Sequence, residues 1–280
     1  MSSYRFCRTD DIGLLVEALN RCWAPYFPGE PPETPATFKR SIRDLQVWCS
    51  SCMVAFEGAD PIGVLIGAKR PAATLIHRIA VHPDHRRQGH GRHLLASLGS
   101  KLAILGPPRI VAEVPETLAA ACGLFGAGGY VQEALLTDYV LDRAEAGAAK
   151  AMALNDGGFV IPVTIDDLAA NGLLEADPRA CWERSVETLT ARKDGLAGVA
   201  VASAERIEAY LIYKEGEIVS LRSLVEDGGV RVKHLLTRLG GGTFRFQKVH
   251  PAEFSAECLQ ALGFRAAGGD RLYATRARPE

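Results

Sequence analysis

Short sequence matches recur in the two halves of this chain at a nearly constant offset of about 140 residues. They join 38–45 to 182–189, 93–95 to 234–236, and 114–130 to 250–264. One such match would be chance, but three in the same order indicate tandem copies of one structural pattern. The chain is therefore expected to fold as two related domains rather than as two unrelated ones.

The boundary between the copies falls where the sequence becomes small and alanine-rich. Residues 144–150 read Ala-Glu-Ala-Gly-Ala-Ala-Lys, a composition typical of a linker. The 280 residues then divide into domains 1–143 and 151–280. Each of these has the usual size of a single domain.

Hydrophobic periodicity predicts alternating strands and helices in the first copy. Helices are expected at 10–23, 37–47, 91–105 and 116–125. Strands are expected at 4–7, 52–57, 62–68, 74–81, 109–114 and 131–141. Mixed elements of this kind predict the α/β class, in which helices pack on a central sheet.

The charge balance and the apolar runs exclude several classes of partner. A formal net charge of -1 gives no overall basic field, so a nucleic-acid partner is not expected. No run is long and apolar enough for a membrane span, and the first residues lack the apolar core of a signal peptide. We therefore expect no membrane partner and a cytoplasmic location.

The seven cysteines are scattered and odd in number, which is unlike a disulfide scaffold. Cys49 and Cys52 form a CxxC pair, but no second pair and no histidine pair follow at the spacing of zinc ligands. We therefore expect ordinary thiols that behave as small apolar side chains, and no metal site.

A basic segment that contains two glycines lies where the strand at 74–81 gives way to the helix at 91–105. It reads Arg86-Arg87-Gln88-Gly89-His90-Gly91-Arg92. Glycines at such a turn accept positive φ and let a ligand approach the backbone. The first N–H groups of the helix have no partner within it and carry the positive end of its dipole. With three arginines beside them, they are expected to bind a phosphate-type anion.

Glycine spacing alone leaves alternatives open. A dinucleotide-binding loop needs G-x-G-x-x-G, but Leu94 stands three residues after Gly91. A P-loop needs Gly-Lys-Ser/Thr, which does not follow here. A basic, solvated helix corner without a ligand remains the plain alternative.

The string from Ile79 to Leu95 reads Ile-Ala-Val-His-Pro-Asp-His-Arg-Arg-Gln-Gly-His-Gly-Arg-His-Leu-Leu. It closely resembles motif A of the GNAT (GCN5-related N-acetyltransferase) superfamily. That motif runs from a hydrophobic strand through V-x-P to [Q/R]-x-x-G-x-[G/A], which Arg86, Gly89 and Gly91 represent here. The resemblance covers residues 4–142, since the order of predicted elements is also that of the family. It implies two tandem GNAT-like domains, each a mixed central sheet flanked by helices.

The resemblance further implies an acetyl-CoA-dependent N-acetyltransferase that transfers the acetyl group directly to a primary amine in a ternary complex. Acetyl-CoA would be the co-substrate, and the acceptor would be a small-molecule or peptide amine. Matched residue by residue, the backbone of Ile79, Ala80 and Val81 would pair with the pantetheine arm. The pyrophosphate would be held by Arg87, Gln88, Gly89, His90, Gly91 and Arg92, with Arg86 as a further cofactor-binding residue.

His77 is the preferred candidate for the base that deprotonates the amine. It precedes the loop on the strand at 74–81, and period two places it on the side of Ile79 and Val81. Imidazole titrates near neutral pH, and some amine-acetylating members of the family carry a histidine base at the matching position. The alternative is a histidine held by a neighbour on a packed sheet. Glu113, near the end of the next strand, is the second candidate, as a base or a substrate-binding carboxylate.

One position departs from the family pattern. Aligning Gly129-Tyr130 with the family's final Gly-Phe puts Phe125 where members often carry a tyrosine that protonates the leaving thiolate. Phenylalanine cannot donate a proton, so a non-catalytic CoA-binding sensor or scaffold stays open as an alternative function. An acyltransferase that uses another acyl-CoA also stays open, because the sequence does not reveal the size of the donor pocket.

The second copy lacks the basic loop. Its strand at 217–224 leads to Val225–Arg231, where Glu226 and Asp227 stand in place of the arginines. Two carboxylates would repel a phosphate, so we expect a degenerate GNAT-like domain that does not bind CoA in the usual way. It could shape the acceptor site, support the first domain or mediate formation of a homodimer.

Overall fold

The computed structural model describes residues 2–143, 158–174 and 179–277. Contacts divide the chain into a first unit, Met1–Ala134 with Arg271–Glu280, and a second unit, Leu135–Asp270. The expected domains, 1–143 and 151–280, differ from these units at two strands, β6 (Val131–Arg143) and β12 (Arg265–Arg276), which each supply residues to both units. The expected linker at 144–150 lies outside the described residues, so the predicted boundary stays a prediction.

The first unit has the strands and helices that hydrophobic periodicity predicts, with ends shifted by a few residues. Its helices are α1 (Ile12–Cys22), α2 (Pro35–Leu45), α3 (His90–Leu105) and α4 (Ala119–Ala127). Three short 3₁₀ turns are η1 (Ala24–Tyr26), η2 (Cys49–Ser51) and η3 (Pro83–His85). The strands are β1 (Ser2–Phe6), β2 (Met53–Glu57), β3 (Asp60–Lys69), β4 (Thr74–Val81) and β5 (Arg109–Pro115).

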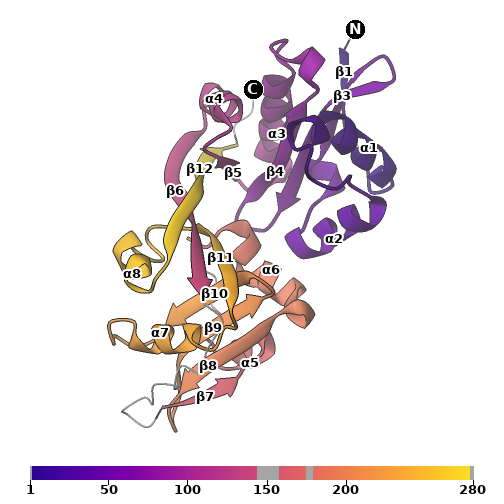
Figure 1. The fold of residues 1–280 in the computed structure, drawn as a ribbon. Helices are drawn as coiled ribbons and strands as arrows, with labels where there is room; N and C mark the ends of the chain where they lie inside the picture. Colours follow the sequence, from indigo (N-terminus) through magenta and orange to yellow (C-terminus); the bar gives the residue numbers. More distant parts are fainter. Residues whose placement is uncertain (1, 144–157, 175–178, 278–280) are drawn as a thin grey trace. The chain divides into compact units, whose positions relative to one another are not determined.

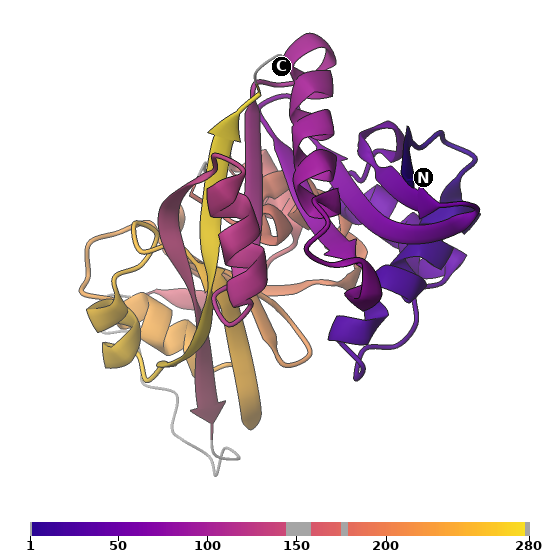
Figure 2. The same ribbon diagram turned by 90° about the horizontal axis from the view of Figure 1, so that it is seen from above.

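The sheet of the first unit runs in the order β1-β2-β3-β4-β5 and continues with the end of β12 and the start of β6. Strands β1 to β4 are antiparallel neighbours, whereas β4 and β5 are parallel. Figures 1 and 2 show α3 on one face of β3 and β4, and α1 with α2 on the other. The mixed sheet flanked by helices that the resemblance implies is confirmed.

The core beneath α3 and α4 is built from apolar side chains that are far apart in the sequence. Leu94, Leu98 and Phe125 are fully buried there, together with Tyr273 from β12. Burying one side chain of this size stabilises the folded state by about 1.5–3 kcal/mol, compared with leaving it exposed. The last strand of the chain is therefore part of the first unit's core.

The second unit repeats the order of elements of the first. Its strands are β7 (Phe159–Pro162), β8 (Ala197–Ala202), β9 (Ile207–Lys214), β10 (Glu217–Ser223) and β11 (Gly242–Val249). Its helices are α5 (Ile165–Ala170), α6 (Val186–Ala191), α7 (Val230–Leu236) and α8 (Ala256–Ala261). Its described residues also form the 3₁₀ turns η4 (Trp182–Arg184) and η5 (Lys193–Gly195). The predicted tandem architecture is confirmed.

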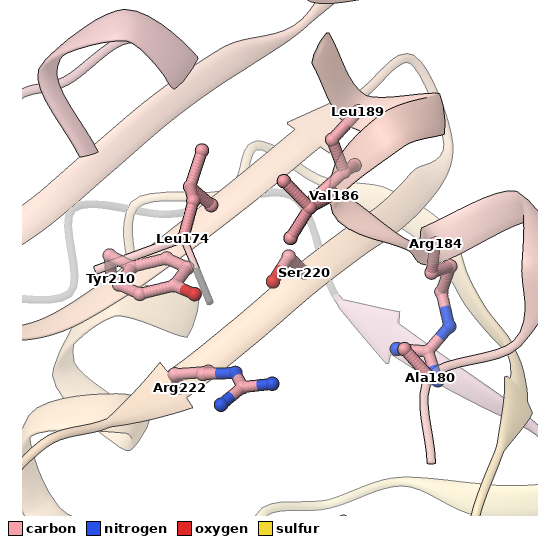
Figure 3. Close-up of a pocket in the computed structure, with 8 residues that line it drawn as sticks. All are labelled: Leu174, Ala180, Arg184, Val186, Leu189, Tyr210, Ser220 and Arg222. Atoms are coloured by element: carbon pink, nitrogen blue, oxygen red, sulfur yellow. The ribbon is translucent and has the colours of Figure 1, made fainter. Parts of the chain in front are cut away.

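The sheet of the second unit runs from the start of β12 through β6-β11-β10-β9-β8-β7. On the side of α5 and α6, a small solvent-open hollow lies against β9 and β10. Figure 3 shows Ser220 near its middle, with the guanidinium groups of Arg184 and Arg222 on its border. Its other lining residues are Leu174, Ala180, Val186, Leu189 and Tyr210.

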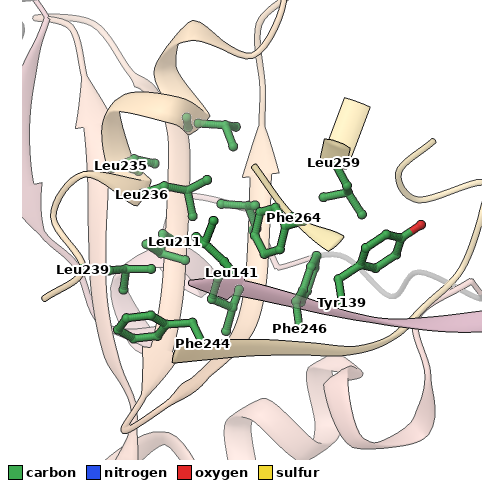
Figure 4. Close-up of a cluster of buried hydrophobic side chains, with 14 of the residues drawn as sticks. Tyr139, Leu141, Leu211, Leu235, Leu236, Leu239, Phe244, Phe246, Leu259 and Phe264 are labelled. Atoms are coloured by element: carbon green, nitrogen blue, oxygen red, sulfur yellow. The ribbon is translucent and has the colours of Figure 1, made fainter. Parts of the chain in front are cut away.

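The opposite face of this sheet packs on α7 and α8. Figure 4 shows the resulting cluster, in which Leu211 and Phe246 from the sheet meet Leu235 from α7 and Leu259 from α8. Tyr139 of β6 is also buried in it. Across the described part of the chain, no helix combines the length and the hydropathy that a membrane crossing requires.

Candidate functional site

Strands β4 and β5 run parallel but separate soon after they begin. Thr74 pairs with Ile110 and Leu75 with Val111, and within the described residues no later pair joins the two strands. β4 remains paired with β3 as far as Val81. The second half of β4 therefore has an open edge on the side of β5, and an open strand edge offers N–H and C=O groups to an extended ligand.

This open edge includes the residues for which the resemblance implies contact with pantetheine. Ile79, Ala80 and Val81 form regular pairs with β3 on one side only. A pantetheine arm carries two amide groups, so it is chemically suited to continue such an edge. The backbone role of these three residues stays a prediction.

His77 is the extra residue of a β-bulge in β4. Ile76 pairs with Gly67 and Arg78 with Ile66, so His77 has no partner in register on β3. A bulge bends its strand and interrupts the alternation of side chains. The sequence carries no sign of it, because the apolar pattern continues on both sides.

The bulge changes which side chains share a face. Ile76, Ile79 and Val81 pair with alternate residues of β3 and therefore point to the same side, where Ile76 and Ile79 join the core beneath α3. The bulge interrupts the count by two between Ile76 and Arg78, so the expected placement of His77 on this face, and its role as the base, stay predictions.

His77 and Glu113 lie at matching positions on the two separating strands. Each stands two residues beyond the last pair, Leu75 with Val111. Both are half-buried. Glu113 points away from α3, since its neighbours Ala112 and Val114 belong to the core on that side. The two candidate bases thus flank the opening between β4 and β5 from its two strands.

The basic loop leads from η3 into α3 with two residues in the left-handed region. Arg87 has φ +63 and Gly89, the residue before the helix, has φ +89. No side chain caps the start of α3 in the described structure. The first N–H groups of a 16-residue helix therefore remain available to a ligand, at the positive end of its dipole.

The arginines of the loop are not neutralised by carboxylates. Arg87 and Arg92 are exposed, and neither side chain has an ion pair or hydrogen bond within the described residues. Arg86 donates from Nε to the Tyr26 hydroxyl at 2.5 Å. The nearby Asp84 is exposed and lies 3.8 Å from His82. A cluster of unpaired guanidinium groups beside an uncapped helix start is suited to a pyrophosphate.

Two further residues of the loop, Gly91 and His90, have contacts that the sequence does not reveal. A Cβ on Gly91 would lie 3.1 Å from Leu124 of α4, so this glycine allows two helices to pack closely. His90 is buried, and its Nδ1 lies 2.7 Å from the Tyr4 hydroxyl. Its Nε2 is buried without a hydrogen-bond partner in the described residues. An unsatisfied buried ring nitrogen of this kind is consistent with a partner that the protein alone does not provide.

Phe125 is part of the core of the first unit. Its ring is buried, edge-on to Tyr130 at 5.1 Å and stacked on Tyr273 at 5.7 Å between centroids. Burial raises the pKa of Tyr130, which makes that hydroxyl a poorer proton donor. Tyr139 is buried in the second unit. Both tyrosines are therefore core aromatics.

Tyr26 and Tyr4 are the two residues at this site that sequence reasoning missed. Tyr26 lies in the aromatic-rich segment after α1, and its hydroxyl reaches both Val81 and Arg86. Tyr4 lies on β1 and reaches His90. Neither contact follows from spacing along the chain, because each joins segments more than fifty residues apart.

The corresponding loop of the second unit is closed by its own carboxylate. The Asp227 side chain accepts hydrogen bonds from the N–H groups of Gly229 and Arg231, both at 2.9 Å. Arg231 also contacts Asp227 through Nη1 at 3.1 Å and Glu208 through Nε at 2.7 Å. The place that a phosphate would take at the start of α7 is thus filled.

Among the described residues no three His, Cys, Asp or Glu side chains gather as metal ligands. The uncapped start of α3 and the arginines without carboxylate partners are chemically suited to the pyrophosphate end of coenzyme A.

Comparison with known proteins identifies a related family and related folds. A family profile described as "Acetyltransferase (GNAT) family" matches residues 15–130. The "Tandem GNAT protein from the clavulanic acid biosynthesis pathway (without AcCoA)" is similar over 100% of both chains, with 17% identity and a TM-score of 0.68. A GCN5-related N-acetyltransferase from Sphaerobacter thermophilus matches 99% of this chain and 96% of its own, with 13% identity and a TM-score of 0.67.

A third similar structure is a putative acetyltransferase from Pyrococcus horikoshii. It covers 100% of this chain and 90% of its own, with 17% identity and a TM-score of 0.63. A search of curated proteins gives no match. At these low sequence identities the similar structures show only the fold. The family profile matches only residues in the first unit. Residues 15–130 thus match the profile of the GNAT family of acetyltransferases, and over its whole length the chain has a fold similar to that of a tandem GNAT protein.

Proposed function

We propose that this protein is an acetyl-CoA-dependent N-acetyltransferase whose active site lies in the first unit. The acceptor is a primary amine on a small molecule or peptide. One observation carries the proposal: the start of α3 has no side-chain cap and is flanked by arginines without carboxylate partners, directly after a strand with an open edge. A site of this kind holds a pyrophosphate at one end and an extended amide chain at the other.

The reaction is a direct acyl transfer in a ternary complex. The free amine nitrogen attacks the thioester carbonyl carbon, a C–N bond forms, and the C–S bond breaks to release coenzyme A as a thiolate. The amine reaches its neutral form by losing a proton to His77, with Glu113 as the second candidate. Placing both reactants in line supplies much of the rate, and proton transfer to a positioned base adds about 10²–10⁴-fold.

The thiolate receives its proton from water. Phe125 has no proton to give, and its ring is buried in the core of the first unit. A thiolate with an ordinary pKa of about 8.5 is a fair leaving group near neutral pH, so the reaction does not require a tyrosine at this position.

Thermal unfolding with and without acetyl-CoA tests binding of the donor. A ligand at one hundred times its Kd adds about 2.7 kcal/mol to the free energy of unfolding, which raises Tm by several degrees. Arg87→Glu places a negative charge beside the pyrophosphate and should remove this rise. No rise in the unaltered protein at millimolar acetyl-CoA would refute the proposal.

A matched charge reversal in the second unit provides the control. Arg206 is exposed and its side chain contacts no other described residue, so Arg206→Glu should leave the acetyl-CoA effect unchanged. Transfer itself is then measured as release of free thiol from acetyl-CoA in the presence of a panel of amines.

A second function is supported by one observation, the buried Phe125. A protein that binds CoA as a sensor or scaffold has no use for a proton donor at this position. Such a protein would show the acetyl-CoA effect on Tm but no amine-dependent thiol release. Repeating the thiol assay with longer acyl-CoA donors separates both functions from a transferase that prefers another acyl group.

A further inference from the structure

The half-buried side chain of Tyr26 in η1 joins the strand and the loop that form the proposed donor site. Its hydroxyl lies 2.5 Å from the Val81 carbonyl oxygen at the end of β4. The same hydroxyl lies 2.5 Å from Arg86 Nε in the basic loop. The Arg86 guanidinium also stacks over the Tyr26 ring, 4.2 Å from its centroid.

The directions of these two hydrogen bonds are fixed by the groups involved. A carbonyl oxygen only accepts, so Tyr26 donates its proton to Val81, and a guanidinium only donates, so Arg86 gives its Nε proton to Tyr26. Burial raises the pKa of the Tyr26 hydroxyl, against a smaller lowering by the Arg86 charge. The hydroxyl therefore keeps the proton that this arrangement needs.

These contacts restrict Arg86 without neutralising it. Tyr26 uses one of the five donors of the guanidinium and one of its faces, and neither is a carboxylate contact. The terminal nitrogens Nη1 and Nη2 have no partner among the described residues. A long side chain with many rotamers is thus held in one orientation while its strongest phosphate-binding donors stay free.

We propose that Tyr26 is a positioning residue, which presets Arg86 for the pyrophosphate of the acyl-CoA donor and ties the segment after α1 to the donor loop. The proposal rests on the proposed function, because it needs coenzyme A to bind at the basic loop. It goes beyond that function by giving a role to a residue outside the family motif. Preorganisation of this kind improves affinity by lowering the entropy lost on binding.

The test compares a donor that carries the pyrophosphate with one that lacks it. Tyr26→Phe keeps the ring under Arg86 and removes both hydrogen bonds of the hydroxyl. We expect it to raise the Kd for acetyl-CoA about three- to tenfold, the scale of an ordinary net hydrogen-bond contribution, and to leave the weak binding of S-acetylpantetheine unchanged. Isothermal titration measures the first, and ligand-observed NMR measures the second.

A double-mutant cycle with Arg86→Lys separates positioning from general packing. If Tyr26 acts through Arg86, Tyr26→Phe should add little further loss of acetyl-CoA affinity once Arg86→Lys is present. Tyr213→Phe, in the second unit, is the matched control for loss of a tyrosine hydroxyl. Its acetyl-CoA Kd should equal that of the unaltered protein.

Two results would overturn the proposal while leaving the proposed function intact. One is an unchanged acetyl-CoA Kd in Tyr26→Phe, and the other is an equal loss of affinity for S-acetylpantetheine, which would indicate a general structural role. A Tm of the ligand-free variant close to that of the unaltered protein shows that folding is not the cause. Failure of the unaltered protein to bind acetyl-CoA would instead overturn both proposals.

Discussion

The start of α3 in the first unit and the start of α7 in the second share a backbone but differ in what satisfies it. Each helix follows a glycine in the left-handed region, with φ +89 at Gly89 and φ +83 at Gly229. The first N–H groups of α3 meet no side-chain cap in the described structure, whereas those of α7 are bound by Asp227. One turn is open to an external anion, and the other is closed by an internal one.

The two units also differ at the bulge that precedes these turns. In the first unit the extra residue is His77, and in the second it is Val219, between Ile218 and Ser220. Val219 is 5% exposed and belongs to the core beside α5 and α6. The second unit thus has a bulge and a glycine turn like those of the first, but no titratable residue at the bulge, and Arg231 in its loop is paired with carboxylates. Four predictions test which of these differences determine binding of the proposed donor.

The largest effect is expected from His77→Asn. Loss of a positioned base should lower kcat by about 10²–10⁴-fold, while the Kd for acetyl-CoA stays the same because the basic loop is untouched. Thiol release with a responsive amine gives kcat, and isothermal titration gives Kd. A kcat within threefold of the unaltered protein would remove His77 from the mechanism, and Glu113→Gln would then be the variant to compare.

Asp227→Ala tests the closed turn of the second unit. The substitution removes two backbone hydrogen bonds and one partner of the partly buried Arg231. Hydrogen bonds to charged groups contribute about 1.5–3 kcal/mol, so we expect the free energy of unfolding to fall by about 2 kcal/mol. Chemical denaturation measures this, and acetyl-CoA affinity should not change. If the variant instead binds CoA at the start of α7, the Asp227 side chain was the only group that prevented binding there.

The same carboxylate should make stability depend on pH. Burial by itself raises the pKa of Asp227, but hydrogen bonds from the backbone and side chain of Arg231 and from Gly229 outweigh it, so the folded pKa is lowered. The stabilisation by ionised Asp227 is therefore fully present above the ordinary pKa of about 3.9. It is lost as the pH falls through the lower pKa that Asp227 has in the folded protein. Asp227→Asn should differ most from the unaltered protein near pH 7 and progressively less below pH 4.

The smallest effects are expected from a matched pair, Gly89→Ala and Gly229→Ala. Neither new Cβ would clash, since nothing lies within 4 Å at Gly89 and Leu262 is 3.8 Å away at Gly229. Both changes force alanine into the left-handed region, which costs about 1–2 kcal/mol. Denaturation should show similar losses for the two variants. Only Gly89→Ala should also lower the affinity for acetyl-CoA. An equal loss of affinity in Gly229→Ala would contradict the proposed assignment of the donor to the first unit.

Local pattern was sufficient to predict the elements that present the loop. The strand at Thr74–Val81 has the predicted ends, and α3 begins one residue earlier than predicted. The hydrophobic periods of strands and helices depend only on residues that are close together in the chain, so they can be recognised in a single sequence. The acidic character of the second loop could likewise be read directly, although not the fact that Asp227 turns inward to cap its own helix.

The features that sequence reasoning missed all depend on distant partners. The bulge at His77 is visible only in the register between β4 and β3. The sequence of an apolar strand looks the same with or without a bulge. The link from Tyr26 to Arg86 spans 60 residues. Tyr273 was assigned to the second domain because it follows that domain in sequence, yet its ring stacks on Phe125 of the first unit.

The contact between Tyr273 and Phe125 affects the order in which the two units can finish folding during synthesis. The first unit needs residues 271–277 for its core, and all of the second unit lies between them and Ala134. At a translation rate of about 5–20 residues per second, that interval takes on the order of 10 s. During this time the first unit lacks its final strand, so it becomes complete only after the second unit has been synthesised.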